Sequence, residues 1–256
     1  FPFKHYLNSA GNIDFEELDK IDGLWTRREI LARYLLLRAV LDQGPDVNGI
    51  EMLIKDVLNS LYEKEIRILH KPVSFFQELG IAIDNILDKH ENVKKIRADE
   101  WAKENKAKNS NKYNLFTDNV HQVLGYAVYR WGVPLCVPLL LEKDLIKDKK
   151  NSNSPLIDYI ESFDSAEIMS QEIKDNKRYG LGKSIGDKAA HLFAKWYLYE
   201  FKINKRKDTS WDGLSYELPI DSNVGRVLFR TGFLFNFVNL KTLNEWEFIQ
   251  KGIGKS

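Results

Sequence analysis

The sequence has almost no cysteine: Cys136 is the only one among 256 residues. One thiol cannot form an internal disulfide bond, and it cannot supply the four thiolates of an iron–sulfur cluster. His121 has no partner at metal-ligand spacing, so we expect no metal and no other cofactor. No run of about 20 uninterrupted apolar residues is present, and the N-terminal segment lacks the apolar core of a signal peptide. We therefore expect a cytoplasmic protein with no membrane partner.

The sequence also lacks a strong overall charge. Its 38 basic and 37 acidic residues leave a formal net charge of +1. Any affinity for nucleic acid must therefore come from local clusters of Lys and Arg, because the field of the whole molecule is weak. Hydrophobic residues make up 43% of the chain, which is enough for one substantial core or two lobes that share a cleft.

Helical periodicity dominates the chain, and strand signals are sparse. The sequence predicts helices over 26–42, 46–63, 72–90, 117–131, 165–177 and 184–201. Thr26 and Glu29 form a capping box at the first of these, Asp164 is the expected cap of the fifth, and Gly132 is the expected end of the fourth. The run VPLCVPLLL, which contains two prolines, is expected to be buried core. The predicted fold class is all-α.

One stretch, 178–232, combines residues that suit a reaction centre. Gly180, Gly182 and Gly186 precede apolar residues at helical spacing, so a glycine-rich turn should lead into a helix with Lys188 in its first turn. Asp221 follows a proline and can cap the start of another helix. An amine beside a tight turn and an acid at a helix start are a plausible reacting pair.

Two segments of this stretch resemble a known family. The sequence SIGDKAA, 184–190, is similar to the hairpin of the helix-hairpin-helix DNA glycosylases, with Lys188 at the position of their nucleophilic lysine. The sequence PIDSNVGRV, 219–227, resembles the segment around their essential aspartate, here Asp221. Ser184 departs from the pattern, since the hairpin usually has its first glycine there. The long gap from Lys188 to Asp221 and the short tail resemble the archaeal 8-oxoguanine glycosylases.

The resemblance implies a single glycosylase unit over 1–256 with two helical lobes that flank a cleft. The hairpin would belong to a lobe of about 45–201, and 1–44 would join 202–256 in a second lobe that carries Asp221. The implied function is base-excision repair of double-stranded DNA by a monomer, with removal of an oxidised purine such as 8-oxoguanine. Lys188 would attack C1′ of the extruded nucleotide, form a Schiff base and cleave the strand by β-elimination, and Asp221 would stabilise the positive charge.

The resemblance also implies DNA contacts. Gln43 would fill the gap that the extruded nucleotide leaves in the duplex, although a solvated loop side chain is an equal alternative. Backbone groups of the hairpin would hold one phosphate, with contributions from Gly182, Lys183, Ser184 and Gly186 and added positive charge from Arg178 and Lys177. The candidate base pocket is Trp246, Phe248 and Gln250. The alternative for these three residues is a tail helix that packs on the core.

Two other functions remain open at this point. The first is a glycosylase for another damaged or mismatched base, such as a modified pyrimidine. The second is a module without catalysis that uses the hairpin only to bind DNA. Activity on lesion duplexes separates the two, because a binding module yields no product with any lesion.

Overall fold

The computed structural model describes residues 27–42, 47–101, 127–201, 226–228 and 230–232. The chain divides into two compact units, Phe1–Ser215 and Tyr216–Ser256. Every regular element in the described ranges is helical, which confirms the all-α prediction. Within these ranges, no helix combines the length and the apolar character that crossing a bilayer requires. The predicted division into lobes at 44 and 201 stays a prediction.

The helices of the first unit match most of the predicted segments. In chain order, the elements are α2 (Arg27–Leu41), α3 (Val47–Glu63), α4 (Val73–Glu78), α5 (Ile83–Lys89), α6 (Val93–Ile96), the π-helical turn η2 (Arg97–Trp101), the π-helical turn η5 (Ala127–Gly132), α8 (Val133–Lys147), α9 (Pro155–Glu161), α10 (Ala166–Asp175), the 3-10 turn η6 (Gly182–Ser184) and α11 (Asp187–Phe201). The predictions for α2, α3 and α11 are confirmed to within a few residues.

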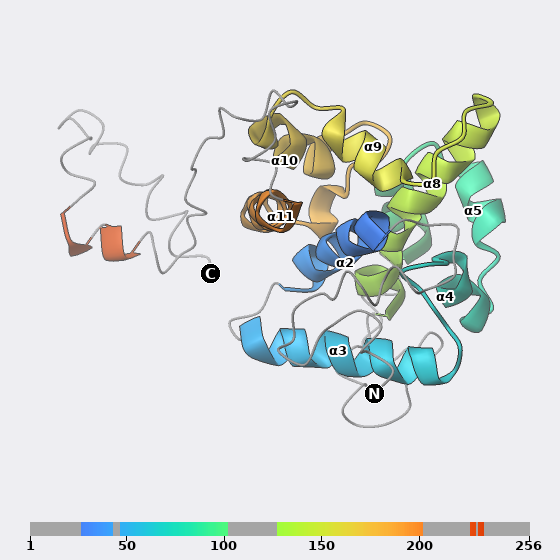
Figure 1. Cartoon of the computed structure of the whole chain (residues 1–256), viewed down its shortest axis with the longest axis horizontal. Helices are drawn as coiled ribbons and strands as arrows, with labels where there is room; N and C mark the ends of the chain where they lie inside the picture. The colour runs from blue at the N-terminus through green and yellow to red at the C-terminus, as the bar shows by residue number, and fades with distance from the viewer. Residues whose placement is uncertain (1–26, 43–46, 102–126, 202–225, 229, 233–256) are drawn as a thin grey trace. The chain divides into compact units, whose positions relative to one another are not determined.

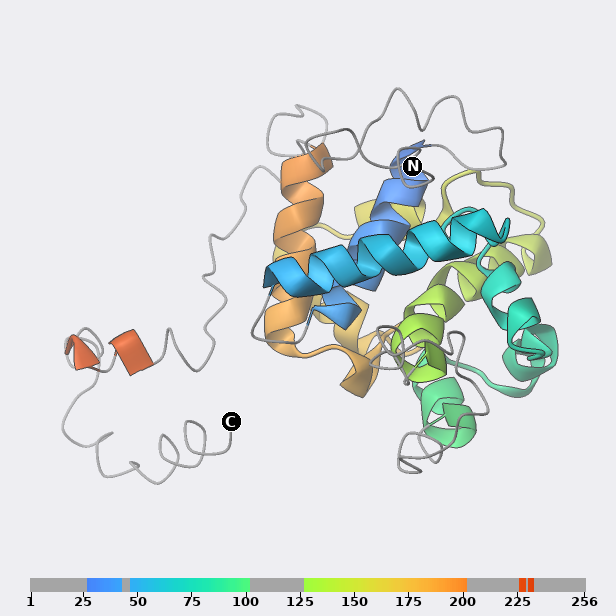
Figure 2. The ribbon, with the colours of Figure 1, turned by 90° about the horizontal axis from the view of Figure 1, so that it is seen from below.

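Helix α2 lies in the middle of the first unit (Figures 1 and 2). It contacts α11, α9, α8, η5 and α3. Its side chains from 29 to 37 are all buried, so the protein encloses the helix on every side, with Glu29 and Arg33 as the polar residues of that stretch. Such a helix takes its stability from packing, because each fully buried Leu or Ile contributes about 1.5–3 kcal/mol of apolar burial.

The prediction of one helix over 72–90 is wrong, because the structure has two helices there. Helix α4 ends at Glu78 and α5 begins at Ile83. Gly80 lies between them with φ of +66°, in the left-handed region where glycine is favoured. The apolar residues keep helical spacing across this break, so periodicity alone could not show it.

The predicted end of a helix at Gly132 is also wrong, because η5 runs directly into α8. Pro134 lies in the first turn of α8, where a missing N–H is tolerated, and Pro138 lies inside the helix. The expectation that this run is buried core is confirmed, since all but one of the residues 133–141 are buried. Cys136 is among them, and burial raises the pKa of its thiol.

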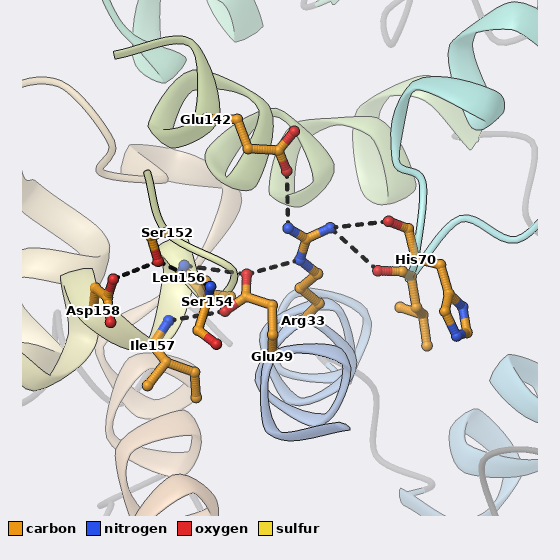
Figure 3. A network of polar contacts seen from close by, with 10 residues as sticks. Glu29, Arg33, His70, Glu142, Ser152, Ser154, Leu156, Ile157 and Asp158 are labelled. Atoms are coloured by element: carbon orange, nitrogen blue, oxygen red, sulfur yellow. Dashed lines mark hydrogen bonds and ion pairs between the residues drawn. The ribbon is translucent and has the colours of Figure 1, made fainter. Parts of the chain in front are cut away.

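A polar network lies inside this apolar packing, around Arg33 of α2 (Figure 3). The guanidinium donates from Nε to Oε1 of Glu29 at 2.9 Å and from one terminal nitrogen to Oε1 of Glu142 on α8, also at 2.9 Å. The other terminal nitrogen donates to the backbone carbonyls of Leu69 and His70, at 3.3 and 3.4 Å. We call these residues the Arg33 network.

Glu29 also caps a helix from which it is distant in sequence. Its two carboxylate oxygens accept the backbone N–H groups of Leu156 and Ile157 in the first turn of α9, each at 3.1 Å (Figure 3). The predicted capping box treated Glu29 as a local cap of its own helix, and its partner Thr26 lies outside the described residues. The structure shows that the carboxylate serves the N-terminus of α9. One buried acid therefore joins α2 to α9.

In the second unit the structure describes one short helical turn. The backbone N–H of Thr231 donates to the carbonyl of Val227 at 2.9 Å. Gly232 follows with φ of +72°. Arg226 and Arg230 are exposed. Asp221 lies outside the described residues.

Candidate functional site

The candidate site is the hairpin between α10 and α11. Helix α10 begins at its cap Ser165, whose hydroxyl accepts the N–H of Ile168 at 3.2 Å, so Ser165 is the cap and the predicted cap Asp164 is not. The helix ends at Asn176. There the Asn176 side-chain oxygen accepts the N–H groups of Arg178 and Tyr179, each at 2.9 Å, and the chain turns back. The two helices α10 and α11 then pack against each other.

Two of the three glycines are required by the backbone of this turn. A Cβ on Gly180 would lie 2.5 Å from the carbonyl oxygen of Asn176, a separation that side chains do not show. Gly182 has φ of +56°, which favours glycine. Gly186 differs, because it is exposed and a Cβ there would meet nothing within 4 Å. The space above Gly186 is open to a ligand.

The turn is attached to the rest of the unit through Arg178. Its guanidinium makes a two-pronged contact with Asp144 on α8, from Nε to Oδ2 at 2.7 Å and from a terminal nitrogen to Oδ1 at 2.5 Å. Its remaining nitrogen donates to the backbone carbonyl of Glu91, and the hydroxyl of Tyr179 donates to Oδ2 of Asp144 at 2.7 Å. We call these four residues the Arg178 clamp. Arg178 was predicted to add charge for phosphate, but its guanidinium binds protein groups.

Lys188 lies in the first turn of α11 and is exposed, as the sequence predicted. Its charge acts on Asp42, the residue after α2. Burial raises the pKa of Asp42, while the positive charges of Arg38 and Lys188 oppose that rise. Gln43 is the next residue along the chain.

Other charged groups surround this helix start. Lys183 in the hairpin and Lys195 two turns along α11 are exposed. Asp187 is paired with Lys174 of α10, and this hydrogen bond lowers the pKa of the Asp187 carboxyl. His191 is half-buried one turn after Lys188.

The structure brings together part of the predicted site. Lys188, Gly182, Lys183 and Gly186 lie in the hairpin or in the first turn after it, with Lys183 and Gly186 exposed. Ser184 also lies there, but its side chain is buried and its N–H donates to Leu181 at 3.1 Å. The remaining predicted site residues lie outside the described ranges: Gln43, Asp221, Trp246, Phe248 and Gln250.

The residues that shape the hairpin were not predicted from the sequence. Asn176 was predicted as helix, although Asn is a residue that bonds to the backbone two or three positions on. Asp144 carried no local signal, because its partner lies 34 positions further along the chain. In the described part of the chain, no group of three or more His, Cys, Asp or Glu residues could hold a metal ion.

Comparison with known proteins adds no relative. No family model matches the sequence, no curated protein matches it, and no solved structure matches the fold.

Proposed function

We propose that this chain is a helix-hairpin-helix DNA glycosylase with AP lyase activity, which removes an oxidised purine such as 8-oxoguanine from double-stranded DNA. The supporting observation is the position of Lys188. It is exposed in the first turn of α11, directly after the glycine hairpin, and its charge reaches Asp42, next to Gln43.

The hairpin supplies the phosphate contact in this proposal. The N-terminus of α11 carries a partial positive charge, and a phosphate can approach closely over Gly186 because no side chain fills that space. Exposed Lys183 adds a charge beside it. Ser184 contributes through the shape of the turn, since its side chain is buried. Such contacts hold the backbone of DNA without reading its sequence.

The chemistry then falls to Lys188 and Asp221. Gln43 occupies the gap in the duplex while the damaged nucleotide is extruded, because its C1′ cannot be reached inside the stack. Lys188 Nζ, as the neutral amine, forms a bond to C1′ as the bond from C1′ to the base breaks, and the base leaves with the electron pair. The sugar ring then opens to an imine as Nζ loses a proton and O4′ gains one. Loss of the C2′ proton to a base breaks the C3′–O bond, and the 3′ phosphate leaves with the electron pair. The Asp221 carboxylate stabilises the cationic sugar.

The same proposal includes the two predicted lobes. A cleft between 45–201 and the second lobe, 1–44 with 202–256, would receive the DNA, and Trp246, Phe248 and Gln250 would line the base pocket. The protein would act as a monomer, because one hairpin and one lysine suffice for one lesion.

Borohydride trapping tests this proposal, because only an amine nucleophile leaves a reducible imine on the sugar. Borohydride added during turnover of an 8-oxoguanine duplex should cross-link the protein to DNA. Lys188→Gln should abolish the cross-link and keep DNA binding, since the substitution leaves the hairpin backbone in place. Lys195→Gln is the matched control, because Lys195 is an exposed lysine on the same helix, and it should be trapped like the wild type.

Other outcomes separate the alternatives. Undiminished trapping by Lys188→Gln would overturn the role of Lys188. Excision without trapping would indicate an enzyme that uses water as the nucleophile. DNA binding without a product on any lesion of a panel that includes modified pyrimidines would leave only a binding module.

A further inference from the structure

The Arg178 clamp fixes the entrance of the hairpin from two sides. On the side of α8, Asp144 accepts two hydrogen bonds from the Arg178 guanidinium and one from the Tyr179 hydroxyl. Planar pairs of this kind restrict the angle of approach as well as the distance. Since Arg178 and Tyr179 are also held by the Asn176 side chain, the turn has little freedom before it reaches Gly180.

On the other side, the start of α6 holds the same turn. The backbone N–H of Val93 donates to the carbonyl of Arg178 at 3.0 Å, and the amine of Lys94 donates to the carbonyl of Asp175 at 2.8 Å. The aliphatic part of Lys94 lies against Gly182, where a Cβ would come within 3.0 Å of it. Residues from three separate regions of the sequence thus meet at one turn of a few residues.

We infer that Asp144 and Arg178 are positioning residues that hold the hairpin in the conformation that binds phosphate, an inference that rests on the proposed function. Each nitrogen of the Arg178 guanidinium donates to a protein group, either Asp144 or the carbonyl of Glu91, so protein contacts set its orientation. Its effect on the ligand, in this inference, passes through the turn. A turn that is ordered before binding loses less entropy on binding, and this raises affinity.

A substitution of Asp144 can distinguish a positioning role from an effect of net charge on DNA binding. If the hairpin region bound DNA only through its net charge, Asp144→Asn would strengthen binding, because it removes a negative charge near a polyanion. If Asp144 positions the turn, the same change weakens binding. The two accounts predict opposite signs for one substitution.

The experiment measures affinity for a duplex that carries a stable abasic-site analogue. Asp144→Asn should raise the dissociation constant by about tenfold, whereas the single-turnover cleavage rate of a lesion duplex at saturating protein should stay within about threefold of the wild-type rate. Asp148→Asn is the matched control, because it removes the same charge from an exposed residue after the same helix. It should leave affinity unchanged or slightly higher.

Two further variants show whether the residues act through each other. Arg178→Gln should weaken binding as Asp144→Asn does, and the double variant should be no weaker than either single variant, because coupled residues are not additive. Tyr179→Phe removes a single hydrogen bond to Asp144 and should cost about two- to threefold in affinity. Additive losses for Asp144→Asn and Arg178→Gln would overturn the positioning role.

Amide hydrogen exchange without DNA tests the clamp independently of the proposed function. Asp144→Asn should speed exchange at Gly180, Leu181 and Ser184, whose N–H groups donate within the turn or, for Leu181, to α10, and it should leave α2 unchanged. Unchanged exchange, or unchanged or tighter DNA binding by a folded variant, overturns the inference while the proposed function stands. A wild-type protein that binds no DNA overturns the proposed function, and the exchange result still decides whether the clamp orders the turn.

Discussion

The Arg33 network and the Arg178 clamp both join a guanidinium to a carboxylate of α8, and they differ in depth. The side chains of Arg33 and Glu29 are 1% and 0% exposed, whereas those of Arg178 and Asp144 are 35% and 24% exposed. The α8 acid of the Arg33 network, Glu142, is 27% exposed, about as much as Asp144. The deep network connects α2, α8 and α9. The shallow clamp connects α8 to a turn that leads into the candidate site.

The two systems also differ in the pKa of their acids. Burial raises the pKa of Glu29, although Arg33 and the N–H groups of α9 oppose the rise. Burial would raise the pKa of Asp144 as well, but the hydrogen bonds from Arg178 and Tyr179 outweigh it and lower that pKa. When two acids share one guanidinium, each receives less stabilisation of its anion, and burial can keep its pKa raised. When a single acid binds the guanidinium, its anion is stabilised and its pKa falls. The burial of an acid and the number of acids that share its guanidinium therefore decide in which direction its pKa moves.

The largest effect that separates the two systems is expected for Arg33→Met. This change removes the common partner of buried Glu29 and part-exposed Glu142, and it should cost about 3–5 kcal/mol in the free energy of unfolding because the Glu29 carboxylate is left unpaired in the core. Chemical denaturation measures it. Arg28→Met is the matched control on the same helix, because Arg28 pairs with Glu161 near the surface, with a side chain 42% exposed. The control should lose at most about 1 kcal/mol, and equal losses would contradict the comparison.

Local patterns in the sequence predicted most helices near these two systems and none of the long-range contacts within them. Helices α2, α3, α10 and α11 were predicted because apolar spacing is a local signal, whereas the predicted caps Asp164 and Glu29 were assigned wrongly. The break at Gly80 and the continuation through Pro134 were missed, since each depends on a backbone conformation that apolar spacing does not encode. Glu29 was assigned to its own helix because the capping-box pattern considers only nearby residues. Its partners on α9 lie more than 120 positions away.

In the candidate site, too, the position of Lys188 was predicted from the local sequence and the direction of Arg178 was not. A short motif with local geometry placed Lys188 in the first turn of α11, and the structure confirms that position. Arg178 was expected to face DNA because it is a cation beside the motif, yet its direction is set by Asp144 on a distant helix. The local sequence predicts the backbone position of a charged residue. The direction of its side chain depends on neighbours that are distant in sequence.

A smaller effect is expected for Glu29→Gln. The amide keeps one acceptor oxygen and replaces the other with a donor, so one of the N–H groups of Leu156 and Ile157 loses its acceptor. A buried donor without a partner costs about 1–3 kcal/mol. Denaturation should show this loss, and amide exchange should quicken at the start of α9.

Ser165→Ala is the control for that substitution, because Ser165 caps α10 at the surface. It should cost about 1 kcal/mol. If both variants lose the same amount, Glu29 acts as an ordinary cap and its burial adds nothing.

The smallest effect is a difference in pH dependence. Burial raises the pKa of Glu142 above its ordinary 4.5, with the charge of Arg33 opposing the rise. A carboxyl group whose pKa is higher in the folded state binds protons more tightly when folded, so its contribution to stability falls as the pH rises from 4.5 through the folded value. Glu142→Gln removes this loss and keeps an oxygen for Arg33. The variant should therefore gain stability relative to the wild type as the pH rises through that window, by less than about 1 kcal/mol.

Asp144→Asn should give the opposite slope, because its folded pKa lies below the ordinary 3.8. The stability that the ionised Asp144 contributes is fully present above 3.8 and is lost as the pH falls through the folded value, so the wild type should be favoured at neutral pH and the difference should vanish in acid. Unfolding free energies of both variants, measured from pH 3 to pH 7, check the pair of slopes. Glu142 and Asp144 are almost equally exposed, so the opposite slopes are expected because Glu142 shares Arg33 with Glu29, whereas Asp144 is, among the described residues, the one acid bound to Arg178. Equal signs for Glu142→Gln and Asp144→Asn would show that sharing a guanidinium does not change how an acid of α8 responds to protons.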